Sequence, residues 1–243
     1  TIYNIIILGK LAIEENQYED AKTIFQFILD NSTDPQLHLE AYDFLLESRI
    51  KNSVPKEYQE IYDNLNSVLG KYHQNPYLTK IVLLTARFEA FHLNNSEAAK
   101  NRLNDYLKNS LNIREQARVK MELADIMVYD EKFNQAILYY AQVEDNLKND
   151  VLAHEASLKL AKAKFYKKDF DWTLQQVKVL KQSPSLLIAN DAIEMFLLIQ
   201  DNSAEDSLRV ALQSYATADL KLYQNKKEEA LQLFLTILQK HKG

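Results

Sequence analysis

Apolar residues recur at positions i, i+3, i+4 and i+7 along almost the whole chain of 243 residues. Leu123, Ile126 and Met127 show this spacing, for example. It has the period of an α-helix and places the apolar side chains on one face. The sequence has no sustained run that alternates apolar and polar residues between turn residues, as a half-buried strand would. The pattern therefore predicts an all-α protein.

Short polar breaks divide this pattern into about thirteen helices. Prolines mark several of the starts, at or next to a first helical turn, where the missing N–H of proline costs nothing; these are Pro35, Pro55, Pro76 and Pro184. The helices expected are 2–15, 18–30, 36–50, 55–71, 77–92, 95–108, 113–129, 133–147, 151–168, 170–182, 186–200, 204–224 and 227–241. Connections this short imply that neighbouring helices run antiparallel.

The chain also contains an internal repeat. Segments 124–136, 161–173 and 218–230 align without gaps, and segments 9–21 and 86–98 follow the same frame more loosely. Each has a small residue, a second small residue twelve positions later, and in most cases an aromatic or apolar residue four positions after that. The five sets are Gly9, Ala21 and Phe25; Ala86, Ala98 and Arg102; Ala124, Ala136 and Tyr140; Ala161, Thr173 and Val177; and Ala218, Ala230 and Phe234. Small residues suit the point where two antiparallel helices cross, because larger side chains would hold the backbones apart.

This spacing resembles the tetratricopeptide repeat, a helix-turn-helix unit of 34 residues. The resemblance implies a right-handed α-solenoid that forms a single domain over residues 1–243. Clear units would be 2–35, 79–112, 117–150, 154–187 and 211–243, with degenerate or inserted helices at 36–76 and 186–210. Arg102 and Lys227 depart from the family, which prefers apolar or aromatic residues at their positions.

The segments LTARFEAFHLNN and KFNQAILYYAQVE are further similar to large exported tetratricopeptide proteins of Bacteroidota. That likeness implies a scaffold in the periplasm or cell envelope rather than the cytoplasm. The chain begins at Thr1 rather than Met, so we expect that an upstream segment, and any targeting signal within it, has been removed.

The amino-acid composition excludes several kinds of functional site. The three glycines, Gly9, Gly70 and Gly243, are far apart, whereas a chain of this length would average about 17. Glycine-rich phosphate loops need several glycines close together. Cysteine is absent, which excludes disulfides and thiolate chemistry. The net charge of −5 offers no overall attraction for nucleic acid or an anionic membrane, which leaves only a local basic patch as a contact for them. The run from Ile5 to Leu8 is too short to span a membrane.

Catalytic signatures are lacking as well. The five histidines form no HExxH motif, so we expect no metal site. Carboxylate pairs such as Glu144 and Asp145 are typical of solvated helix faces rather than of a desolvated acid–base pair. We therefore expect no catalytic residue and no cofactor.

In the family that this chain resembles, the first helix of each unit lines a concave groove. Carrying the frame over gives two columns of candidate partner-binding residues, five and one positions after the first small residue. The candidates are Phe91, Tyr129, Tyr166 and Tyr223 together with Arg87, Asp125, Lys162 and Asp219. Aromatic side chains with interleaved charges suit an extended peptide or a partner helix. Alternatively, the tyrosines pack at the seam between adjacent units, with only their hydroxyls in water.

Two functions follow. The favoured one is a non-catalytic adaptor that binds a protein partner, with no nucleic acid and no membrane span. The alternative is a solute- or glycan-binding module of an outer-membrane uptake system, in which Trp172 would stack on a sugar. A basic cluster at Lys159, Lys162, Lys164, Lys167 and Lys168 is either a contact for an acidic partner or phosphate backbone, or a solvated helix face.

Overall fold

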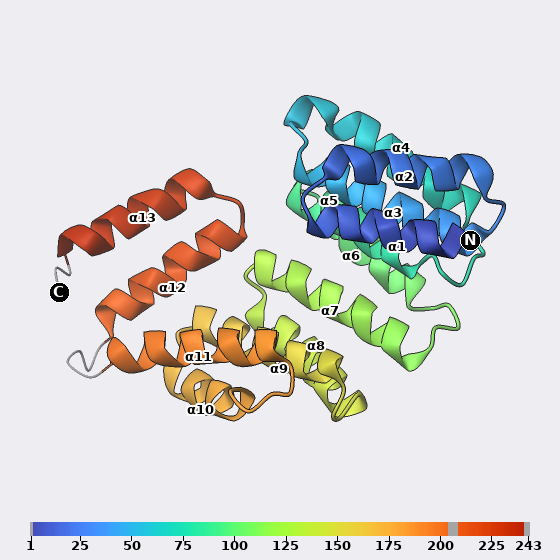
Figure 1. Ribbon diagram of the computed structural model, residues 1–243. Coiled ribbons are helices and arrows are strands. Elements are labelled where there is room, and N and C mark those ends of the chain that lie inside the picture. The colour runs from blue at the N-terminus through green and yellow to red at the C-terminus, as the bar shows by residue number, and fades with distance from the viewer. Residues whose placement is uncertain (1, 204–208, 241–243) are drawn as a thin grey trace. The chain divides into compact units, whose positions relative to one another are not determined.

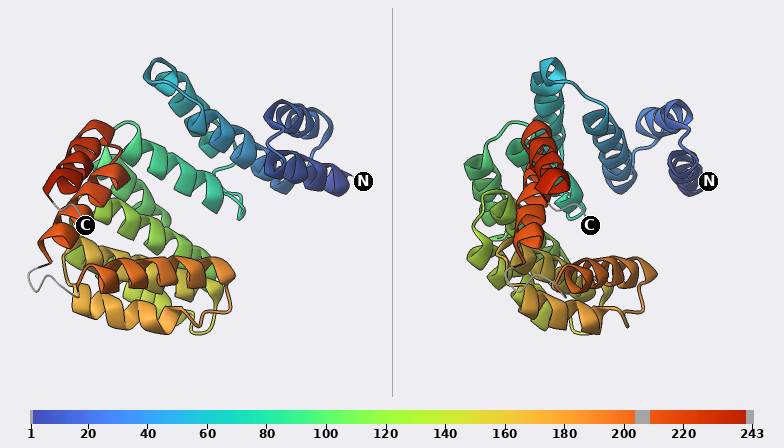
Figure 2. Two further views of the ribbon diagram at one scale, coloured as in Figure 1. Left: turned by 60° about the vertical axis from the view of Figure 1, so that its left-hand side comes forward. Right: turned by 90° about the vertical axis from the view of Figure 1, so that its left-hand side faces the viewer.

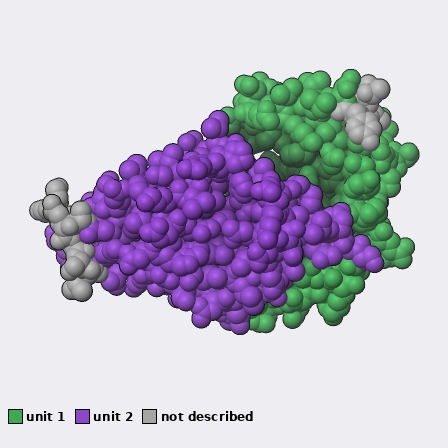
Figure 3. Space-filling view, turned by 90° about the horizontal axis from the view of Figure 1, so that it is seen from below, with its two compact units in different colours: residues 1–109 green, residues 110–243 purple. Residues whose placement is uncertain are grey.

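A computed structural model describes residues 2–203 and 209–240. The secondary structure of these residues consists of thirteen α-helices and one short 3-10 turn, as the hydrophobic pattern predicts (Figure 1). The chain divides into two compact units, residues 1–109 and 110–243, coloured separately in Figure 3.

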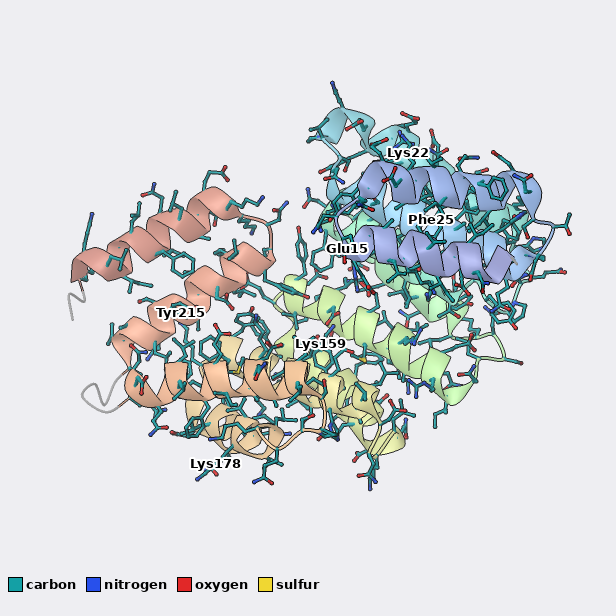
Figure 4. All side chains as sticks on the ribbon, viewed as in Figure 1. Glu15, Lys22, Phe25, Lys159, Lys178 and Tyr215 are labelled. Carbon is teal, nitrogen blue, oxygen red and sulfur yellow. The ribbon has the colours of Figure 1, made fainter. Side chains whose placement is uncertain are left out.

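Unit 1 contains six α-helices. They are α1 (Ile2–Glu14), α2 (Tyr18–Asn31), α3 (Pro35–Lys51), α4 (Tyr58–Lys71), α5 (Thr79–Phe91) and α6 (Ser96–Tyr106), with a 3-10 turn at Pro55–Glu57. Helix α1 packs on α2, and α5 packs on α6. Phe25 of α2 is buried and stacks on Phe44 of α3, with 4.9 Å between the ring centres. Figure 4 labels Phe25 between α1 and α2.

The described residues of unit 2, 110–203 and 209–240, form seven α-helices. They are α7 (Ile113–Tyr129), α8 (Phe133–Asn146), α9 (Val151–Tyr166), α10 (Phe170–Leu180), α11 (Leu186–Asp201), α12 (Val210–Tyr223) and α13 (Lys227–Lys240). Each helix from α7 to α10 packs on the next, and α12 packs on α13 (Figures 1 and 2). Helix α9 also packs on α7, α11 and α12, so it lies at the centre of this unit.

Local signals explain the helix boundaries. The Asp34 side chain caps α3 by accepting a hydrogen bond from the Gln36 N–H, 2.9 Å away, with Pro35 at the first helical position. Asn112 and Glu115 form a capping box at the start of α7. The helix expected over 204–224 begins later: Arg209 has a left-handed φ of 51°, α12 starts at Val210, and residues 204–208 lie outside the described part.

The turns between paired helices have one recurring geometry. Asn16, Glu131, Lys168 and Asn225 each follow the first small residue of their repeat by seven positions, and each has a φ between 58° and 67°. In all four turns the next residue donates its N–H to a carbonyl five positions earlier, over 2.7 to 3.0 Å. This bond is typical of a helix that ends in a left-handed residue. Asparagine, glutamate and lysine fill a position where glycine is usual, which explains how so few glycines suffice.

The α5–α6 turn is one residue longer than the gap-free alignment assumed. Asn94, eight positions after Ala86, has the positive φ there, and the Asn95 N–H reaches the Glu89 carbonyl at 2.8 Å. Everything after the turn shifts by one position, so Ala99 and Leu103 are fully buried where the alignment had placed Ala98 and Arg102. The longer turn therefore accounts for the departure at Arg102.

Candidate functional site

Helices α7, α9 and α12 are the first helices of three hairpins in unit 2 and carry six of the eight candidate residues. Asp125 of α7 is 8% exposed. Its carboxylate accepts hydrogen bonds from the Tyr140 hydroxyl at 2.5 Å and from Lys159 Nζ at 2.6 Å. Figure 4 labels Lys159 on α9. One buried carboxylate thus joins α7, α8 and α9.

These contacts change the acidities of the groups around Asp125. Burial, followed by the charge of Asp125, raises the pKa of Tyr140 well above its usual value. Burial alone would lower the pKa of Lys159, but the Asp125 charge and hydrogen bond outweigh it, so the net shift is upward. Tyr140 therefore stays protonated and Lys159 stays charged, the states that their hydrogen bonds to Asp125 need.

A second carboxylate joins α9 to α12. The Tyr166 hydroxyl donates to Asp219 Oδ2 at 2.9 Å, and Lys162 Nζ lies 3.6 Å from the same oxygen. Tyr166 is only 6% exposed. Burial, with a further contribution from Asp219, raises its pKa far above the usual tyrosine value. Tyr166 thus lies in the seam between two hairpins with its hydroxyl bonded inside the unit.

Helix α12 also reaches back to α7. The Tyr223 hydroxyl donates to the Asp125 backbone carbonyl at 2.9 Å. Gln224 Nε2 donates to the Tyr129 carbonyl at 2.8 Å and to Glu131 Oε1 at 3.0 Å. The ring centres of Tyr166 and Tyr223 are 6.3 Å apart. The first helices of the three hairpins therefore form one polar network.

The structure brings together five of the eight candidates: Asp125, Lys162, Tyr166, Asp219 and Tyr223. Tyr129 is half-buried beside them, and burial, followed by the charge of Asp130, raises its pKa. Arg87, which is exposed, and Phe91, which is half-buried, lie on α5 in unit 1.

Sequence reasoning missed a buried ion pair in unit 1. Glu89 is 1% exposed, and Arg102 approaches it with two nitrogens, Nε at 3.0 Å and one terminal nitrogen at 2.6 Å. The Tyr62 hydroxyl donates to the same carboxylate at 2.7 Å. The Glu89 hydrogen bond raises the pKa of Arg102. The extra residue in the α5–α6 turn brings Arg102 to Glu89. The alignment of the repeat segments contained no gap, so it did not predict this extra residue.

Most of the basic cluster, which lies on α9 and in the turn after it, is paired within the unit. Lys159 and Lys162 contact Asp125 and Asp219, Lys164 Nζ lies 3.2 Å from Asp169, and Lys167 donates to Asn134 at 2.6 Å. These partners engage four of the five lysines within the unit, although the Lys162 side chain remains 46% exposed.

Trp172, the residue on which the glycan alternative depends, is half-buried on α10. It packs against the apolar cores of unit 2, and Lys164 Nζ lies 4.9 Å from its ring centre. The ring is therefore engaged in packing and in a cation–π contact.

The part of the chain that the structure describes holds no group of three or more histidine or acidic side chains placed to bind a metal ion. None of its helices combines the length and apolar character needed to cross a lipid bilayer. No protein-family model, curated protein or solved structure matches this chain.

Proposed function

We propose that this protein is a non-catalytic scaffold, a right-handed α-solenoid of tetratricopeptide-like hairpins that binds a protein partner. The observation that carries the proposal is the same left-handed turn at the same repeat position in four hairpins, at Asn16, Glu131, Lys168 and Asn225. Repeated hairpins build extended surfaces, which suit partner binding better than they suit an enclosed reaction site.

The partner surface in unit 2 is the face of α7, α9 and α12. Lys162 is exposed there, and Tyr129 and Tyr223 are half-buried, so these three offer direct contacts. Asp125, Tyr166 and Asp219 hold the helices in place through the polar network. Arg87 and Phe91 would contribute a separate contact on unit 1.

The resemblance to exported tetratricopeptide proteins favours an assembly of the bacterial cell envelope. The packing of Trp172 against the core gives no support to the glycan alternative, because sugar stacking needs an open aromatic face.

Co-purification of the full-length protein from the cells that produce it separates the two functions. The scaffold proposal expects stable, stoichiometric protein partners and no heat of binding with oligosaccharides in calorimetry. Absence of any partner, together with oligosaccharide binding that is lost in Trp172→Ala, would overturn it.

A further inference from the structure

Helix α11 lies outside the repeat frame and presents an apolar stripe to solvent. Leu186, Ile193 and Leu197 are 79%, 40% and 48% exposed. At 100° per residue these positions fall within about 40° of one another around the helix. The opposite side of α11 is buried, with Ile188 and Ala192 packed in the core shared with α9 and α10.

The charge on α11 is entirely negative. The helix contains Asp191, Glu194 and Asp201 and has no lysine or arginine. None of these carboxylates forms an ion pair or a side-chain hydrogen bond with a described residue, whereas Asp125 on α7 and Asp219 on α12 are paired with lysines. One cation does contact α11: Lys181 Nζ lies 3.7 Å from the Phe196 ring centre, roughly a quarter-turn away from the stripe.

We propose that α11 is a docking site for a basic amphipathic helix of a partner protein. The apolar residues of such a helix would cover Leu186, Ile193 and Leu197, and its lysines or arginines would pair with Glu194 and Asp201, which border one side of the stripe. From Leu186 to Leu197 the stripe runs about 16 Å, enough for about three turns of a partner helix. The inference rests on the proposed scaffold function but concerns a different surface from the α7, α9 and α12 face.

The negative charge of α11 favours a basic partner helix over a lipid surface as the ligand of this stripe. Glu194 and Asp201 lie beside the stripe and form no ion pair with a described residue, so they repel an anionic bilayer and attract a cationic helix. Vesicles containing anionic lipid are therefore expected not to bind the protein.

The probe is a synthetic peptide of roughly 14 residues, with leucines at helical spacing on one face and lysines on the other. Fluorescence anisotropy with the whole protein should show saturable one-to-one binding, and a peptide with glutamates in place of the lysines should not bind. Glu194→Gln with Asp201→Asn should weaken binding about tenfold. The matched control, Glu228→Gln with Glu229→Gln on α13, removes the same charge and should leave binding unchanged.

A second pair of variants tests the apolar stripe. Ile193→Ser with Leu197→Ser should abolish binding, whereas Leu231→Ser with Leu235→Ser, also exposed and four residues apart on α13, should not. Circular dichroism melting checks that each variant is folded. Failure of the wild type to bind the lysine peptide, or equal losses in the α11 and α13 variants, would overturn the α11 proposal. Partners that co-purify and contact the α7, α9 and α12 face would then still support the scaffold.

Discussion

The Tyr166 hydroxyl donates a 2.9 Å hydrogen bond to the Asp219 carboxylate, 53 positions later in the sequence. Tyr166 is the last residue of α9, and Asp219 lies in the second half of α12. The bond therefore joins two hairpins, and Lys162 adds a second contact to the same carboxylate. The buried Tyr166 thus links the two hairpins through its hydroxyl group.

Removing that hydroxyl should destabilise unit 2. In Tyr166→Phe the ring still packs, but a hydrogen bond to a charged group is lost, which typically costs about 1.5–3 kcal/mol. Tyr139→Phe is the matched control, because Tyr139 is half-buried on α8 and its hydroxyl has no hydrogen bond with a described residue. Urea denaturation measures both free energies of unfolding. Equal losses in the two variants would contradict the role given to the Asp219 contact.

The Glu89–Arg102 pair should behave as a buried ion pair. Arg102→Leu leaves the Glu89 carboxylate buried without its cation, which typically costs about 3–5 kcal/mol. Adding Glu89→Leu removes the stranded charge and should recover part of that loss. A double-mutant cycle by urea denaturation measures the coupling. A double variant less stable than Arg102→Leu alone would show that the pair is not coupled in this way.

Two glycines should respond in opposite directions to substitution by alanine. A Cβ at Gly9 would lie 2.7 Å from Phe25 Cζ, and the Phe25 ring is itself buried against Phe44. Gly9→Ala should therefore destabilise the protein by about 1–3 kcal/mol. A Cβ at Gly70 of α4 meets nothing within 4 Å, so Gly70→Ala should stabilise it by up to about 1 kcal/mol. Thermal denaturation measures the melting temperatures of both variants. A shift of the same sign in both would refute the role of Gly9 at the helix crossing.

Two adjacent lysines test the recurring turn. Lys168 has a φ of 67°, which favours glycine, whereas Lys167 has a φ of −72° and donates to Asn134. Lys168→Gly should stabilise the protein by about 0.5–1 kcal/mol, and Lys167→Gly should destabilise it by at least as much. The melting temperatures of the two variants provide the comparison. A lower melting temperature for Lys168→Gly than for Lys167→Gly would argue against the left-handed turn.

Local signals in the sequence located most of the helices. Helix α7 spans residues 113–129, as predicted, and Tyr18, Phe133 and Phe170 are the first residues of α2, α8 and α10. Periodicity, caps and small crossing residues act over a few turns, so one sequence is enough to read them.

The polar network could be predicted only in part. The positions directly after the first small residue gave Asp125 and Asp219, and the positions five residues after it gave Tyr166 and Tyr223. Nothing in these spacings indicated which side chains contact one another. The bond from Tyr223 to the Asp125 carbonyl spans 98 positions and depends on how α12 returns to α7. The Glu89–Arg102 ion pair was not predicted, because a single extra residue in the α5–α6 turn shifts the register of the residues of α6.

Site-specific photo-crosslinking of the full-length protein in the cells that produce it tests the scaffold account most directly. A photoreactive residue replaces Lys162 on α9, and a control carries it at Lys178, which is also exposed but lies on α10 (Figure 4). A scaffold that binds its partner on this face should give a discrete protein adduct from position 162 and none from position 178. Adducts from position 178 alone, or from neither position, would contradict partner binding on the face of α7, α9 and α12.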